Sequence, residues 1–145
     1  MRIVTGSDHA GFTLKRDLMG WLESLGHTVV DVGIDAKERC DYPDFAAKVG
    51  HAVVGAEADW GLLVCGTGIG MAMAANKIDG IRAAVVSDAF SARSTRQHND
   101  ANVLCLGERV VGAGLAREIL AAWLDADFEG GRHQGRIDKI KALEA

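Results

Sequence analysis

A cysteine followed at once by a glycine-rich loop is the part of this sequence best suited to chemistry. Cys65 ends the apolar run 62–64, and residues 66–70 read GTGIG. Glycines let backbone N–H groups face a bound anion, and the start of a following helix favours negative charge. A thiol beside such a loop is stabilised as a thiolate, which can abstract a proton or attack a carbon. From the residues alone, Cys65 is equally well explained as the last buried residue of a strand.

The glycine spacing does not match a nucleotide-binding loop. It is G-x-G-x-G, because position 71 is Met71 rather than glycine. The loop therefore misses the dinucleotide fingerprint G-x-G-x-x-G, and no G-K-[ST] follows it. A glycine loop of this kind is, by itself, a weak signal of function.

Other polar residues could share a site with this cysteine. Asp8 and His9 follow an apolar run directly, at a place where a core histidine is unusual. His98 stands in RQHND just before another apolar run, although loop histidines are often only solvated surface groups. Arg132 and Arg136 lie four residues apart and could share a helical face that binds a small anion. The commoner fate of such a pair is to be solvated charges of a chain tail.

Composition narrows the class of protein. The chain has 145 residues, of which 48% are hydrophobic and 25% charged, which predicts one globular domain over residues 1–145. The net charge is −4 and acids and bases are interspersed, unlike the basic stripe of a nucleic-acid surface. No apolar stretch reaches the roughly 20 residues that span a bilayer, and the chain does not start with a signal-peptide pattern. Three widely spaced cysteines without a C-x-x-C pair predict a reduced, cytoplasmic protein.

Strand-like and helix-like segments alternate along the chain. Strands are predicted at residues 2–7, 27–32, 61–65, 81–86 and 102–106. Helices are predicted at 11–25, from Pro43 to Val54, after the glycine loop, from Ser87 or Asp88 to about 98–100, at 114–124 and in the tail. In the first helix, leucines at 14, 18, 22 and 25 share one face. The pattern predicts a Rossmann-like, doubly wound, five-stranded parallel sheet in three layers with a C-terminal helical tail. Ligands bind at the carboxyl ends of such strands.

Six segments, in order, resemble the ribose-5-phosphate isomerase B family, which includes galactose-6-phosphate isomerase subunits. They read GSDHAGF (6–12), DYPDFA (41–46), CGTGIGMAMAANK (65–77), IRAAVVSD (81–88), RQHNDANVLCLGERVVG (96–112) and EGGRHQGRI (129–137). They extend across nearly the whole chain, so the resemblance favours a functional Cys65 over a buried one. Some relatives carry a glutamate base where this chain has Met71, which places the chain in the cysteine-base branch.

The resemblance implies an aldose–ketose isomerase that works through a cis-enediolate without metal or cofactor. Cys65 would be the base that moves a proton between carbons 1 and 2 of the sugar. Thr67 and His98 would assist opening of the furanose ring, with His98 as proton donor, and Asp8 would handle hydroxyl protons. Loop N–H groups would hold the enediolate oxygen; they belong to Gly66, Gly68, Ile69 and Gly70.

The resemblance also implies the binding residues. Tyr42 and Asn99 would position the sugar, and the phosphate would be gripped by His9, Arg132 and Arg136, with Arg109 nearby. Ribose 5-phosphate is the default substrate, and galactose or allose 6-phosphate and a tetrose phosphate are alternatives. Two other classes remain open: a non-catalytic sugar-phosphate-binding module, and a cysteine hydrolase with a Cys65–His98 pair.

Topology predicts that the site is shared between subunits. Cys65 ends a strand, whereas His98 and Asn99 precede one, so they should lie at opposite edges of a parallel sheet. A strand of 5–6 residues is roughly 17–20 Å long, too far for His98 to reach its own Cys65. We therefore expect a homodimer with two shared sites, as in the family, and possibly a tetramer.

Overall fold

A five-stranded parallel sheet lies at the centre of the molecule, with strand order β2-β1-β3-β5-β4. The computed structural model describes residues 1–34 and 38–144. The strands are β1 (Arg2–Ser7), β2 (Thr28–Asp31), β3 (Trp60–Cys65), β4 (Ala83–Val85) and β5 (Val103–Gly107). The helices are α1 (Phe12–Ser24), α2 (Tyr42–Val54), α3 (Ile69–Ala75), α4 (Ala89–Asn99), α5 (Ala113–Leu124) and α6 (Arg132–Lys141).

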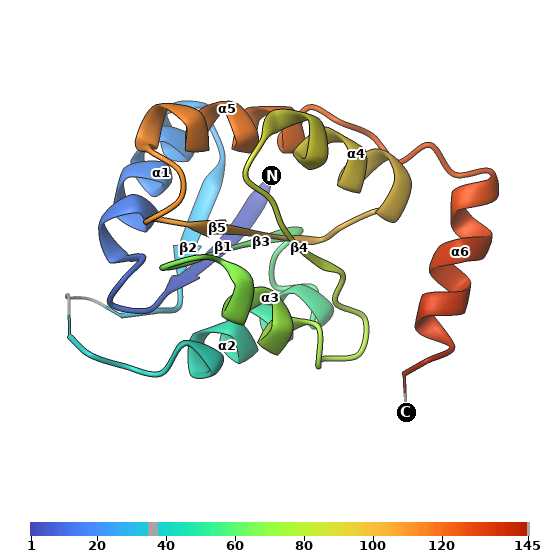
Figure 1. Cartoon of the computed structure of the whole chain (residues 1–145), viewed down its shortest axis with the longest axis horizontal. Coiled ribbons are helices and arrows are strands. Elements are labelled where there is room, and N and C mark those ends of the chain that lie inside the picture. The colour runs from blue at the N-terminus through green and yellow to red at the C-terminus, as the bar shows by residue number, and fades with distance from the viewer. Residues whose placement is uncertain (35–37, 145) are drawn as a thin grey trace.

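The helices form layers on both faces of the sheet (Figure 1). Helices α1, α4 and α5 cover one face, α2 and α3 cover the other, and α6 stands beside the layers next to the end of α4. The predicted doubly wound fold with three layers and a C-terminal helical tail is therefore confirmed. Within the described residues, no helix is both long and apolar enough to cross a membrane.

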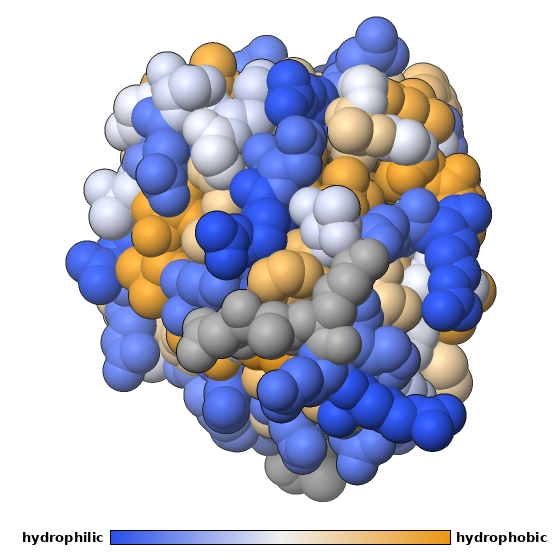
Figure 2. Space-filling model, turned by 90° about the vertical axis from the view of Figure 1, so that its left-hand side faces the viewer, coloured by the Kyte–Doolittle hydropathy of each residue, from blue (hydrophilic) through white to orange (hydrophobic). Residues whose placement is uncertain are grey.

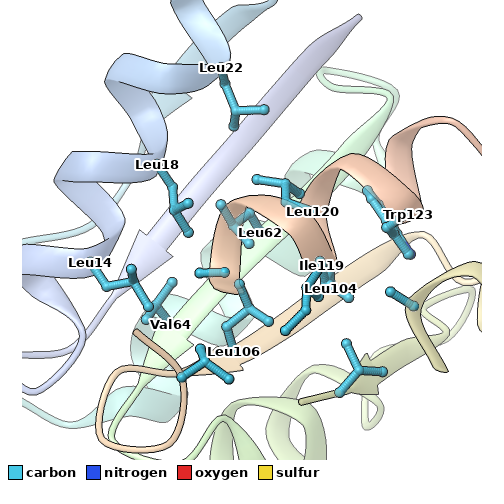
Figure 3. Packing of buried hydrophobic residues seen from close by; sticks show 14 of the residues in the cluster. Leu14, Leu18, Leu22, Leu62, Val64, Leu104, Leu106, Ile119, Leu120 and Trp123 are labelled. Atoms are coloured by element: carbon cyan, nitrogen blue, oxygen red, sulfur yellow. The ribbon is translucent and has the colours of Figure 1, made fainter. Parts of the chain in front are cut away.

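Leucine periodicity explains how α1 packs on the sheet. Leu14, Leu18 and Leu22 are buried against β3, β5 and α5 (Figure 3), as their spacing predicts. The expectation for Leu25 is wrong, because α1 ends at Ser24 and Leu25 is 53% exposed. The chain leaves the helix through Gly26, whose φ of 92° favours glycine.

The strand register brings three strand ends to one edge of the sheet. Ser7 of β1 pairs with Val64, and Cys65 of β3 pairs with Gly107 of β5. In Figure 1 these strand ends lie on the left of the molecule. This carboxyl edge is where a doubly wound sheet binds its ligands.

A buried ion pair fixes the segment after β2. The Lys15 side chain is fully buried, and its Nζ donates to both carboxylate oxygens of Asp31 at 3.0 Å. It also donates to the carbonyl oxygens of Gly33 and Ile34, at 3.3 and 3.1 Å. The ammonium group thus has several acceptors around it, which a buried charge requires.

Candidate active site

Cys65 lies at the end of β3 with its sulfur under the glycine loop. The residue is 5% exposed, and its Sγ accepts a hydrogen bond from the Gly68 N–H at 3.1 Å. Gly68 has φ of 80°, a left-handed conformation that favours glycine and turns this N–H back toward the sulfur. An N–H group aimed at the sulfur stabilises a thiolate. Because α3 is only seven residues long, the loop N–H groups rather than a long helix supply this positive end.

Glycines allow neighbouring chain segments to press against the loop. A Cβ on Gly107 would lie 2.6 Å from the backbone of Thr67, and one on Gly70 would lie 2.6 Å from the ring of Tyr42. Tyr42 therefore lies directly beside the loop. The Thr67 hydroxyl oxygen accepts a hydrogen bond from the Ile69 N–H at 3.2 Å.

The segment after β5 places an arginine on the same edge. The Glu108 N–H donates to the Cys65 carbonyl at 2.9 Å, and the Arg109 N–H donates to the Gly66 carbonyl at 3.1 Å. A Cβ on Gly66 would lie 3.5 Å from Nη1 of Arg109. Arg109 is exposed, so its guanidinium is a free cation beside the loop that an anionic ligand can reach.

Asp8 and His9 border the loop from the end of β1. The Asp8 carboxylate is 7% exposed, and its Oδ1 accepts N–H groups of Ala10 and Gly11 at 2.9 and 3.1 Å. A Cβ on Gly11 would overlap the Val64 carbonyl group, so glycine is needed for this close approach of the β1 and β3 ends.

His9 has a defined tautomer in this arrangement. Its Nδ1 accepts a hydrogen bond from the Cys40 N–H at 3.4 Å. The neutral ring then carries its proton on Nε2, which becomes the donor for a ligand. His9 is partly exposed, so that donor is within reach of a small molecule.

The remaining predicted residues form a second group at the other edge of the sheet. His98 and Asn99 are exposed residues at the end of α4, and Arg132 and Arg136 are exposed residues one turn apart on α6. Within residues 1–34 and 38–144, the two arginine side chains form no hydrogen bond or ion pair. The predicted helical spacing of these arginines is thus confirmed.

The register measures how far apart the two groups lie. Gly61 of β3 pairs with Val103 of β5, and four residues later Cys65 pairs with Gly107. At about 3.3 Å per residue, that stretch of strand is roughly 13 Å long, and His98 lies beyond its far end. The predicted phosphate group is divided in the same way, because His9 and Arg109 lie beside Cys65 whereas Arg132 and Arg136 do not. In Figure 1, α6 and the end of α4 lie on the right, opposite the strand ends.

Surface shape agrees with an incomplete site in one chain. Figure 2 views the carboxyl edge, where hydrophilic residues lie between hydrophobic patches. A concavity of about 700 Å³ lies at the other edge, between β4, α4 and the end of α6. Its lining includes Asn99 but not Cys65, so this concavity is not the pocket in which the thiol would act.

Two residues of the second group were not singled out by the sequence. His133 stacks on His98, with ring centroids 4.4 Å apart and planes 14° apart, and Glu129 faces both rings. Burial, followed by the nearby charge of Arg132, lowers the pKa of His133. The spacing of Glu129 and His133, four residues across two glycines, was the available signal.

Known proteins share the whole of this arrangement. The family model described as ribose/galactose isomerase matches residues 3–140, and the chain belongs to that family. It is 52% identical to ribose-5-phosphate isomerase B of Escherichia coli over 99% of this chain and 96% of the relative. It is 45% identical to D-erythrulose-4-phosphate isomerase of Pectobacterium atrosepticum over 99% of this chain and 95% of the relative.

A solved structure adds a ligand to the comparison. The crystal structure of ribose-5-phosphate isomerase B from Mycoplasma genitalium contains bound ribulose 5-phosphate. It superposes with a TM-score of 0.94 at 46% identity and covers 99% of this chain and 95% of that chain.

Proposed function

We propose that this protein is an aldose–ketose isomerase that interconverts ribose 5-phosphate and ribulose 5-phosphate through a cis-enediolate, without metal or cofactor. The observation that carries the proposal is the thiol of Cys65 held under a glycine loop, with the Gly68 N–H on its sulfur. That arrangement supplies a base and donors for the oxyanion that the base creates. The names of the relatives in two bacteria agree with an isomerase of pentose phosphates.

Proton transfer is assigned to Cys65. Its thiolate would take the proton from carbon 2 of the open-chain aldose and return it to carbon 1. The enediolate oxygen would be stabilised by the loop N–H groups, which belong to Gly66, Gly68, Ile69 and Gly70. The Ile69 N–H is bound to the Thr67 hydroxyl oxygen. A substrate oxygen would replace that acceptor and release the hydroxyl of Thr67 toward the sugar.

Substrate hydroxyl groups are assigned to residues on both sides of the loop. Oδ1 of Asp8 is fixed by two backbone N–H groups, so its second oxygen would exchange protons with a sugar hydroxyl. The Tyr42 ring would bound the sugar on the side of Gly70, and His98 and Asn99 would reach the ring oxygen and hydroxyls from a second subunit. The phosphate would lie between His9 and Arg109 of one subunit and Arg132 and Arg136 of the other.

The complete site requires a homodimer. A single chain separates the two groups of residues by the length of the strands, so one isologous contact that joins them creates two equivalent sites. Exposed hydrophobic side chains on adjoining elements support such a contact, and they include Ile69, Met73, Val85 and Phe90. Large exposed apolar residues gathered on one side of a protein mark interfaces. The three free cysteines fit a reducing compartment, and we therefore place the dimer in the cytoplasm.

Substrate length distinguishes the main proposal from its alternatives. The relative that acts on a tetrose phosphate keeps tetrose, galactose and allose phosphates open as substrates. The deciding experiment compares kcat/KM for ribose 5-phosphate, erythrose 4-phosphate and allose 6-phosphate. We expect the pentose phosphate to be preferred by at least about 10-fold, the discrimination one extra or missing carbon group allows. Preference for another length would replace the substrate, and binding without any turnover would leave only a sugar-phosphate-binding module.

A further inference from the structure

We propose that His133 and Glu129 are positioning residues that hold the imidazole of His98 ready to protonate the ring oxygen of the bound sugar. The inference rests on the proposed function, in which His98 opens the furanose ring. Neither residue need touch the substrate. The two act on the ring plane and the charge surroundings of the proton donor.

His133 forms a rigid floor beneath the His98 ring. The rings are stacked with centroids 4.4 Å apart and planes 14° apart. The His133 side chain is only 6% exposed, whereas that of His98 is 44% exposed. A buried ring therefore fixes the plane of a half-exposed one, which leaves the outer face and edge of His98 for a partner subunit. Ring orientation matters because an error of about 1 Å in a reacting group can cost 10²-fold in rate.

The turn before α6 is built to bring this floor into place. The Glu129 N–H donates to the Gln97 carbonyl at 3.0 Å, which ties the turn to the last residues of α4. Gly130 and Gly131 follow with φ of 67° and 57°, values that favour glycine. The His133 N–H then donates to the Gly130 carbonyl at 3.1 Å. One short segment thus fixes both positioning residues against His98.

Charge separates the roles of the two histidines. Oε1 of Glu129 lies 3.8 Å from Nε2 of His98 and 3.5 Å from Nε2 of His133. Burial is the largest cause that lowers the pKa of His133, with Arg132 next and Arg136 contributing, while Glu129 opposes them. His133 is therefore kept as a neutral platform. The exposed ring beside the carboxylate is the one placed to carry and deliver the proton.

Metal binding is a poorer explanation of the same three residues. The Nε2 atoms of the two histidines and a Glu129 oxygen all lie within 4.8 Å of one another. An imidazole, however, binds a metal in its own ring plane, and two stacked rings with nearly parallel planes direct their lone pairs side by side. These directions do not converge on one ion at the 2.0–2.1 Å that zinc takes from nitrogen.

Ribulose 5-phosphate allows ring opening to be separated from proton transfer. Its phosphate occupies the oxygen that a ketopentose would need to close a five-membered ring, so it binds as an open chain. In D₂O, Cys65 can remove a proton from carbon 1 and return a deuteron, and this exchange requires no ring opening. Turnover of ribose 5-phosphate requires both steps. A residue that only positions His98 should affect turnover and spare the exchange.

The test measures both reactions for four variants. For His133→Ala we expect kcat for ribose 5-phosphate to fall between about 10- and 100-fold, with KM changed less than about 3-fold. Deuterium exchange into ribulose 5-phosphate should stay within about 2-fold of wild type. Glu129→Gln should show the same pattern, as should His98→Ala with the largest loss. His133→Phe keeps a ring under His98 and should recover most of kcat. Matched controls are His51→Ala and Glu57→Gln, both exposed on other parts of the chain.

Each alternative result has a distinct meaning. Equal loss of turnover and exchange in His133→Ala, together with no recovery in His133→Phe, would indicate a structural role and overturn the inference. Unchanged turnover in His133→Ala would also overturn it. Loss of wild-type activity after treatment with EDTA, restored by Zn²⁺, would replace positioning by metal binding. If the wild-type protein neither turns over ribose 5-phosphate nor exchanges ribulose 5-phosphate, the proposed function itself fails.

Discussion

Mixing two inactive variants tests whether each site is shared between subunits. Cys65→Ala and His98→Ala remove groups from opposite edges of the sheet. The pairing of Gly61 with Val103 and of Cys65 with Gly107 puts roughly 13 Å of strand between these edges. His98 precedes Val103, so a chain cannot complete its own site. Each variant alone should lose activity by about 10²- to 10⁴-fold, the contribution of a proton-transfer group.

The symmetry of a dimer fixes how much activity returns. Random exchange at equal amounts makes about half of the dimers mixed, and each mixed dimer has one site with both groups and one with neither. Activity should thus approach about a quarter of wild type, or about half for mixed dimers purified through two different tags. Cys65→Ala mixed with Thr67→Ala is the matched control, because both changes lie at the same edge and leave no intact site. Purified Cys65→Ala/His98→Ala dimers that stay inactive would refute the shared site.

Three further predictions concern the phosphate, the fold and the thiol. Arg136→Ala should raise KM for ribose 5-phosphate roughly 10- to 100-fold, since a charge-assisted hydrogen bond contributes about 1.5–3 kcal/mol; equal inhibition of variant and wild type by inorganic phosphate would refute the assignment. Asp31→Ala leaves the buried Lys15 ammonium without its carboxylate, so urea unfolding should show a loss of about 3 kcal/mol; a loss below about 1 kcal/mol would refute this account of the pair. Iodoacetamide should modify Cys65 before Cys105, because burial raises the pKa of the Cys105 thiol; ribose 5-phosphate should slow only the reaction at Cys65, and faster modification of Cys105 would contradict this prediction.

The sequence predicted the carboxyl edge well because strand ends follow directly from the order of elements. Apolar runs ending at Ser7 and Cys65, each followed by polar residues, were enough to place both ends side by side. The spacing of Leu14, Leu18 and Leu22 identified the buried face of α1. The error at Leu25 arose because periodicity does not mark the residue at which a helix ends.

Other features depended on contacts that the sequence does not encode locally. The predicted strand 81–86 is only three residues long as β4. The backbone N–H groups of Arg82 and Ala83 donate to the side chains of Asn102 and Asn76, so side chains replace strand pairing there. The stack of His98 on His133 joins segments 35 positions apart in the sequence, and only the packing of α6 against α4 reveals it.

The central claim is that Cys65 is the base of an isomerase. The most direct measurement is the rate at which purified Cys65→Ala converts ribose 5-phosphate to ribulose 5-phosphate, beside wild type and Cys40→Ala. Circular dichroism and unfolding should confirm that the folds match. The account predicts a fall in kcat of at least about 10²-fold for Cys65→Ala, and activity near wild type for Cys40→Ala. A Cys65→Ala protein that keeps the wild-type kcat would contradict the account.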